Sequence, residues 1–224
     1  MYTATYRSAT AINQAMLRVY NYMALAILVS TVTSALVASS PALMAFLFTG
    51  IMKWIVILAP LVAVFGITIA LNADPPRSVA VAMLAGFASL MGLSLSTVFY
   101  VYTAGSIVMA FASSAILFGT MSFYGYFTKR SLESIGQFLF VGLIAIIIAS
   151  IVNIFVGSDV MTMVISALAV IIFLGLTAYD TQQIREMVSY DKESGATEVS
   201  GALMLYLDFI NIFINLLQLF GQKK

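Results

Sequence analysis

Two carboxylates carry the most promising chemistry in this sequence. Asp180 ends one long apolar segment and Asp208 lies inside another, and they are the two acidic residues within or at the rim of such segments. An acidic residue inside a membrane helix is costly and is functional by default. Two carboxylates in contact at low dielectric cannot both ionise cheaply. We therefore expect the pair to share one proton and to act as a pH sensor and gate.

Loss of the shared proton would leave two negative charges that repel each other, demand water or recruit a cation. Calcium prefers several oxygen ligands, so Asp180 and Asp208 are predicted to form a weak calcium site, with no other cofactor. At 100° per residue, Asn211 and Asn215 continue the polar face that begins at Asp208. They are predicted to line a pore, with hydrogen bonding to neighbouring helices as the alternative.

Two simpler readings compete with this one. Asp180 could face water at a helix end or pair with Arg185. Asp208 could donate to a Tyr or Ser and only position its helix. Arg77 is a candidate latch for one of the two aspartates, although Asp74 is its nearer partner in sequence.

The composition is that of a membrane protein. The 224 residues are 62% hydrophobic and 8% charged, where soluble domains have about 25% charged residues. Mean hydropathy is +1.06. The absence of Cys and His excludes disulfides and Cys- or His-based sites, and a net charge of +1 gives no footprint for nucleic acid.

The sequence predicts an all-α membrane protein with seven transmembrane helices. Residues 1–20 form a cytoplasmic N-terminal arm, and residues 21–222 form a single seven-helix domain. Each apolar segment is close to the roughly 20 residues that cross a bilayer. The spans are expected at about 22–40, 51–71, 79–99, 106–127, 136–156, 160–179 and 202–220.

A polar connector is expected at 181–200, the longest and the only charged one. It would place Asp180 level with the membrane rim and Asp208 roughly 10 Å along its own helix. Basic residues favour a cytoplasmic N-terminus. The inner side then holds seven of them, and the outer side holds Lys53, Lys223 and Lys224; the inner seven are Arg7, Arg18, Arg77, Lys129, Arg130, Arg185 and Lys192.

Small residues four apart mark the third and fourth spans. The pairs Ala82/Gly86, Ala88/Gly92 and Ala115/Gly119 are expected to allow close approach between helices.

Three segments resemble a known family, the Bax inhibitor-1 (transmembrane Bax inhibitor motif) proteins. They are LGLTAYDTQQI at 174–184, LYLDFINIFINLL at 205–217 and, as in bacterial members, RVYNYMAL at 18–25. The resemblance implies a central last helix wrapped by six others and a pH-sensitive calcium leak gated by Asp180 and Asp208. It also implies links to cell-death suppression and to control of a membrane-bound protease. A bacterial inner membrane is the expected location.

Other functions remain open beside the leak. An intramembrane aspartyl protease also uses two membrane aspartates, but residues 206–208 lack its Gly-x-Gly-Asp motif, so we expect no enzyme. An interaction protein that regulates a membrane protease or a stress pathway is the main alternative. A proton/calcium exchanger differs from a leak only in moving calcium uphill.

Overall fold

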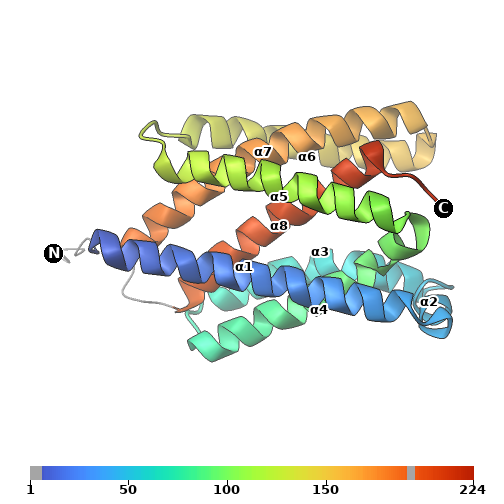
Figure 1. Ribbon diagram of the computed structural model, residues 1–224, viewed down its shortest axis with the longest axis horizontal. Helices are drawn as coiled ribbons and strands as arrows, with labels where there is room; N and C mark the ends of the chain where they lie inside the picture. Colours follow the sequence, from blue (N-terminus) through green and yellow to red (C-terminus); the bar gives the residue numbers. More distant parts are fainter. Residues whose placement is uncertain (1–6, 191–194) are drawn as a thin grey trace. The chain divides into compact units, whose positions relative to one another are not determined.

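The structure, a computed structural model, describes residues 7–190 and 195–224. In these residues the backbone forms eight α-helices and no β-strand (Figure 1). Seven of the helices are long and apolar enough to cross a membrane, which confirms the predicted fold class. The eight helices are α1 (Ala9–Ala38), α2 (Pro41–Leu47), α3 (Met52–Leu71), α4 (Arg77–Val101), α5 (Ala104–Phe127), α6 (Glu133–Val156), α7 (Asp159–Tyr190) and α8 (Gly195–Phe220), and all but the short α2 are candidate spans.

The chain divides into two compact units. Of the described residues, 7–102, 186–190, 195–206 and 224 belong to the first unit, and 103–185 and 207–223 belong to the second. Helices α7 and α8 therefore contribute to both. Among the seven spans, α8 has the largest buried share of its apolar window, 56%, against 33% or less for the others. The apolar faces of α8 are thus mostly covered by protein.

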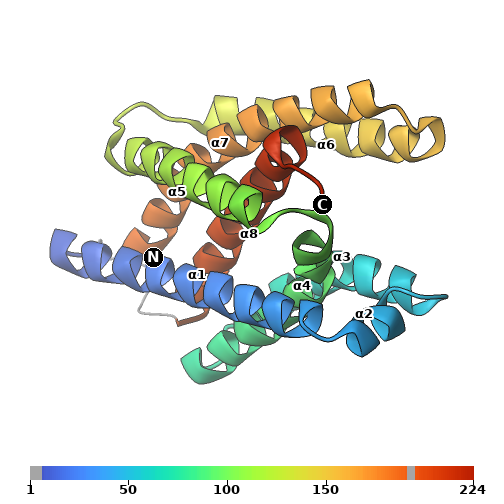
Figure 2. The same ribbon diagram turned by 45° about the vertical axis from the view of Figure 1, so that its right-hand side comes forward.

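In the first unit, α1 packs along α4, and α3 packs against α4 (Figures 1 and 2). The closest approach of α1 and α4 is at Gly92, where an added Cβ would lie 2.7 Å from the carbonyl oxygen of Ser30. There the hydroxyl of Ser34 donates to the carbonyl oxygen of Gly92 over 2.7 Å. The packing role predicted for Ala88 and Gly92 is confirmed, since Ala88 is fully buried.

A buried ion cluster joins three helices of the first unit. Arg18 of α1 donates from Nε to both carboxylate oxygens of Glu198 at 2.9 Å, and its Nη2 lies 2.7 Å from Oε1. Arg77, the first residue of α4, approaches Oε2 at 3.4 Å. Glu198 is only 1% exposed. At Gly195 an added Cβ would collide with Arg77. The first turn of α8 is therefore fixed against α1 and α4.

The first helix begins earlier than the sequence prediction of about residue 22. Ser8 caps it by accepting a hydrogen bond from the backbone N–H of Ala11. Ile12, Met16 and Val19 are buried at helical spacing along it. The polar residues between them lower the mean hydropathy of this stretch, so hydropathy alone did not predict the buried helix face. Residues 1–6 of the predicted arm lie outside the described residues.

The predicted polar connector at 181–200 is wrong in most of its length. Helix α7 continues to Tyr190 and α8 begins at Gly195. Ile184 and Val188 of α7 and Val199 of α8 are at most 1% exposed, so buried apolar residues recur at helical spacing among the charged ones. Residues 191–194, including Lys192 of the orientation argument, lie outside the described residues.

In the second unit, α6 and α7 run side by side and are joined by a tight turn (Figures 1 and 2). Gly157 ends α6 in the left-handed conformation, with φ of 67°. Two further glycines set the spacing around α7. At Gly125 of α5 an added Cβ would collide with the backbone of Ala178, and at Gly136 of α6 it would lie 2.5 Å from the ring of Tyr179. Both α5 and α6 are therefore in close contact with α7 just before Asp180.

The other two predicted small-residue pairs do not pack as expected within the described residues. An added Cβ at Gly86 or at Gly119 would meet no atom within 4 Å. Ala115 and Gly119 are both exposed. Helix contacts in this fold are thus made at Gly92, Gly125 and Gly136 and not along every small-residue stripe.

Replacement of Gly125 by Ala is expected to destabilise the protein by about 1–3 kcal/mol, because the methyl group has no room against the α7 backbone. Gly119→Ala on the same helix is the matched control. It is expected to be neutral or to stabilise by up to about 1 kcal/mol through helix propensity. Thermal unfolding of the two purified variants in one detergent measures the difference. Equal melting temperatures would contradict the close α5–α7 approach.

Replacement of Glu198 by Gln is expected to lower the unfolding temperature, because it leaves two arginines without their shared counter-charge. The loss should stay below the roughly 3–5 kcal/mol typical of a fully buried pair, since both arginines are partly exposed. Glu186→Gln, an exposed acidic residue of the same unit, is the control and should change little. A Glu198→Gln protein as stable as the control would show that the cluster contributes no stability.

Candidate functional site

Asp208 lies on the part of α8 that belongs to the second unit. It is 4% exposed. Its neighbour Phe209 is held by edge-to-face contacts with Phe111 and Phe118 of α5, at ring-centre distances of 5.3 and 5.8 Å. These aromatic contacts fix the rotation of α8 about its axis. Because α8 starts at Gly195, Asp208 lies about 20 Å along the helix and not the expected 10 Å.

Asp180 lies within α7 and not at its end. The helix continues for about 15 Å beyond it, to Tyr190. Its side chain is partly buried. The prediction that the helix ends at Asp180 is therefore wrong, whereas the level of Asp180 relative to the membrane rim stays a prediction. The position of Asp208 along α8 was mispredicted for the same reason, because α7 and α8 both extend into the stretch that the sequence predicted to be a loop.

The structure brings the two carboxyl groups together. The side chains of Asp180 and Asp208 lie close enough for a hydrogen bond between them. A carboxylate has only acceptor oxygens, so such a bond requires a proton on one partner. The second oxygen of Asp208, Oδ2, is buried and has no hydrogen-bond partner among the described residues. A buried oxygen of this kind is suited to a protonated carboxyl group or to a cation that arrives later.

Two buried threonines of α7, Thr177 and Thr181, lie within about one turn of Asp180. Thr177 donates its hydroxyl proton to the carbonyl oxygen of Phe173 over 2.7 Å, so towards the nearby Asp208 its oxygen can only accept. Thr181 donates to the carbonyl oxygen of Thr177, and its hydroxyl lies 3.0 Å from that of Ser122 on α5. Buried hydroxyl groups of α5 and α7 are therefore bonded to each other next to the segment that carries Asp180.

No described Lys or Arg forms an ion pair with either aspartate. Arg185, the alternative partner of Asp180, donates to the carbonyl oxygen of Tyr126 over 3.1 Å and stacks over its ring. Arg77, the latch candidate, pairs with Glu198 in the first unit. The carboxyl pair is thus not compensated by a positive side chain in the described part of the chain.

The amide groups that follow Asp208 are bonded within their own helix. Asn211 donates to the carbonyl oxygen of Leu207 and Asn215 to that of Asn211, each over 2.8 Å, and both side chains are partly exposed. Gln218 differs, because it accepts from Ser166 of α7 over 2.7 Å. The side-chain oxygens of Asn211 and Asn215 are left to face a pore or a neighbouring helix, and both readings stay predictions.

The described residues contain no group of three or more His, Cys, Asp or Glu that could hold a metal ion. A calcium ion at the pair would have two carboxylates as its only charged ligands. Hydroxyl, amide or water oxygens would have to complete its coordination. A site with so few charged ligands would have a low affinity for calcium, in line with the weak site that the sequence predicts.

The sequence reasoning missed Glu198, which was counted as part of a loop. A signal for it exists in the sequence. Ala196, Val199 and Ala202 are apolar at helical spacing around it, and all are buried. That pattern extends the last helix toward its N-terminus and places Glu198 on a covered face, where an acidic residue needs a cation.

Comparison with known proteins agrees with the motifs. The family model described as inhibitor of apoptosis-promoting Bax1 matches residues 12–224. The chain is 38% identical to the inner membrane protein YbhL of Escherichia coli, over 93% of this chain and 92% of that protein. It is 38% identical to an uncharacterized protein of Borreliella burgdorferi, over 95% and 93% of the two chains. It is 37% identical to the uncharacterized protein RP147 of Rickettsia prowazekii, over 93% and 89%.

A family match that begins in α1 and runs to the last residue covers both units and both aspartates. The chain is a membrane protein of the Bax inhibitor-1 family.

Proposed function

We propose that this protein is a pH-sensitive calcium leak channel gated by the Asp180–Asp208 pair. The observation that carries the proposal is two carboxyl groups close enough to share a proton, Asp208 buried and Asp180 partly buried, with no Lys or Arg of the described residues paired with either. A structural role alone would be better served by a carboxylate paired with an arginine. Such a pair exists elsewhere in this chain, at Arg18 and Glu198.

The gate works through the charge of the pair. With one shared proton, the carboxyl groups hold each other by a hydrogen bond and so tie α7 to α8. Without that proton, two negative charges in contact at low dielectric repel each other strongly. Entry of water or a divalent cation is the physical relief available, because no described arginine or lysine pairs with them. Calcium is the cation that carboxylate and amide oxygens suit.

The direction of the pH response follows from this charge balance. Acidic conditions favour the protonated, hydrogen-bonded pair, which is closed. Rising pH removes the proton, separates the helices and creates the calcium site. The leak is therefore expected to increase with pH. In this proposal calcium moves down its own gradient. A proton/calcium exchanger, in which release of the proton would drive calcium uphill, is the alternative.

Calcium would reach or leave the pair along the partly exposed oxygen-bearing face at Asn211 and Asn215. We propose a cytoplasmic N-terminus, from the distribution of basic residues. We propose the bacterial inner membrane as the location, supported by the name of the YbhL relative.

A second candidate function is regulation of a membrane partner such as a protease. The observation that favours it is the exposed pair Ala115 and Gly119 on α5, with open space at Gly119. Small residues that no helix of this chain covers suit close packing of another protein's helix. Co-purification of partners from native membranes, compared between the unmodified protein and Gly119→Leu, tests it. An identical set of partners in both would exclude this face.

Asp180→Asn and Asp208→Asn are each expected to abolish the pH response of calcium flux, because neither leaves two carboxyl groups to share a proton. In liposomes carrying the purified protein and a trapped calcium dye, the unmodified protein should leak several-fold faster at about pH 8 than at about pH 6.

Asp159→Asn is the matched control, an exposed acidic residue in the first turn of the helix that carries Asp180. It should keep the full pH response. Flux that is the same in all four proteins at every pH would rule out the gate. Calcium accumulation against its gradient when a proton gradient is applied would show that the protein is an exchanger and not a leak channel.

A further inference from the structure

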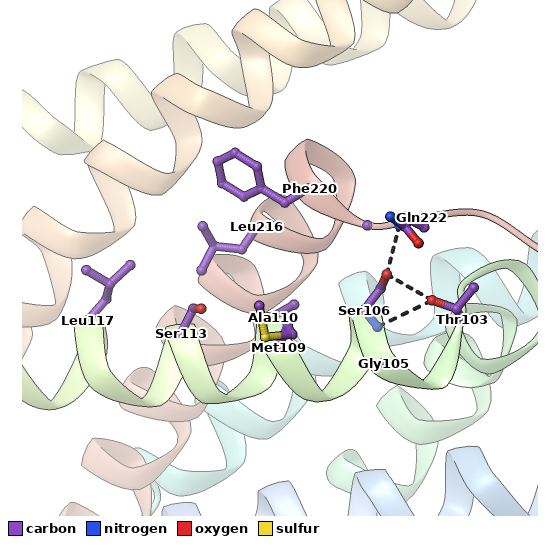
Figure 3. A pocket seen from close by; sticks show the side chains of 11 residues that line it. Thr103, Gly105, Ser106, Met109, Ala110, Ser113, Leu117, Leu216, Phe220 and Gln222 are labelled. Atoms are coloured by element: carbon purple, nitrogen blue, oxygen red, sulfur yellow. Dashed lines mark hydrogen bonds between the residues drawn. The ribbon is translucent and has the colours of Figure 1, made fainter.

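A second site lies away from the carboxyl pair, at the C-terminal end of α8. A pocket of about 530 Å³ opens in the second unit between the N-terminal half of α5, the last turns of α8 and the residues that follow it (Figure 3). Met109 and Leu117 of α5 and Leu216 and Phe220 of α8 give it apolar walls. Its volume is in the range of ordinary ligand sites.

The polar groups of the pocket gather at one end. Figure 3 shows Thr103, Ser106 and Gln222 together on one side, and Leu117 at the far side. The hydroxyl of Thr103 donates to that of Ser106 over 2.9 Å, and Ser106 accepts the backbone N–H of Gln222 over 2.9 Å. The backbone N–H of Thr103 donates to the carbonyl oxygen of Gln222 over 3.0 Å. These bonds tie the segment after α8 to the start of α5.

This polar end coincides with the ends of two membrane spans. Thr103 is the N-cap of α5, and Gln222 lies two residues beyond Phe220, the last residue of α8. Span ends lie near the interface between hydrocarbon and headgroups. Leu117 lies about 20 Å further along α5, at 1.5 Å per residue, and so within the roughly 30 Å hydrocarbon core. The pocket is thus polar at the interface and apolar toward the bilayer centre.

We propose that this pocket binds one phospholipid molecule, with an acyl chain along Met109, Leu117 and Leu216 and the headgroup at the Thr103–Gln222 end. The polarity gradient of the pocket is that of a phospholipid in a bilayer. Its walls belong to spans that also expose apolar residues outside the pocket, such as Ile116 of α5, so lipid is the medium that fills it. The exposed Lys223, next to Gln222, favours an anionic headgroup.

Calcium is a poorer occupant of this pocket. None of the residues that line it is acidic, and the hydroxyls of Thr103 and Ser106 already bond to each other. A hard divalent cation needs several available oxygens. An acyl chain requires none. The lipid site is therefore separate from the proposed calcium route and does not depend on it.

Gly105 offers a clean test, because it lines the pocket and an added Cβ there meets no atom within 4 Å. Gly105→Trp should fill the pocket. Gly119→Trp, at an equally open glycine of the same helix that does not line the pocket, is the matched control. Ser113→Phe, at an exposed lining residue, is a second filling variant that keeps the test valid if Gly105→Trp fails to fold.

Each full-length protein is reconstituted in vesicles of phosphatidylethanolamine and phosphatidylglycerol, extracted in mild detergent and weighed intact by native mass spectrometry. The unmodified protein and Gly119→Trp are expected to retain one phospholipid, mainly phosphatidylglycerol. Folded filling variants should lose it almost completely. Equal retention by all the proteins, no retained lipid in the unmodified protein, or a retained free fatty acid in place of phospholipid would overturn the proposal.

Discussion

The structure depends on one constraint, that a charge inside a bundle of apolar helices must be neutralised where it stands. The chain meets it in two ways. In the first unit, Glu198 is neutralised permanently by Arg18, with Arg77 beside it. In the second, Asp180 and Asp208 lie close together, no Lys or Arg of the described residues pairs with either, and a shared proton is the neutralisation that we propose. A permanent ion pair fixes an element in place. A proton can be removed by the surroundings, so the second arrangement is the one that can respond.

The elements around the pair are arranged to hold it without neutralising it. Close approach at Gly125 and Gly136 sets the position of α7 just before Asp180, and the ring contacts of Phe209 set the rotation of α8. The hydroxyl of Thr177 offers a hydrogen bond but no charge. Arg185, five positions from Asp180, is turned toward Tyr126 instead. The protein thus keeps a positive charge away from the two carboxyl groups, which is what a proton-dependent gate needs.

Much of this could be read from the sequence, for definite physical reasons. Seven spans follow from hydropathy and length, and an aspartate inside an apolar helix identifies itself, since little else in such a segment is polar. The position of the two aspartates along α7 and α8 could not be predicted in the same way. Hydropathy averages over a window, so the charged residues of 181–200 concealed the buried faces at Ile184, Val188 and Val199, and Glu198 with them. Contact at Gly92 and Gly125, against open space at Gly86 and Gly119, likewise depends on which helices meet, which spacing alone does not specify.

The central claim is that one proton is shared between Asp180 and Asp208, and infrared spectroscopy detects that proton directly. The difference spectrum at neutral pH between the unmodified protein in membranes and the Asp180→Asn/Asp208→Asn double variant isolates the carboxyl groups of the pair. The account predicts the carbonyl stretch of a protonated carboxylic acid in that difference, and its loss when the pH is raised. A difference that contains only carboxylate bands at neutral pH would mean that both groups are already ionised, and would contradict the account.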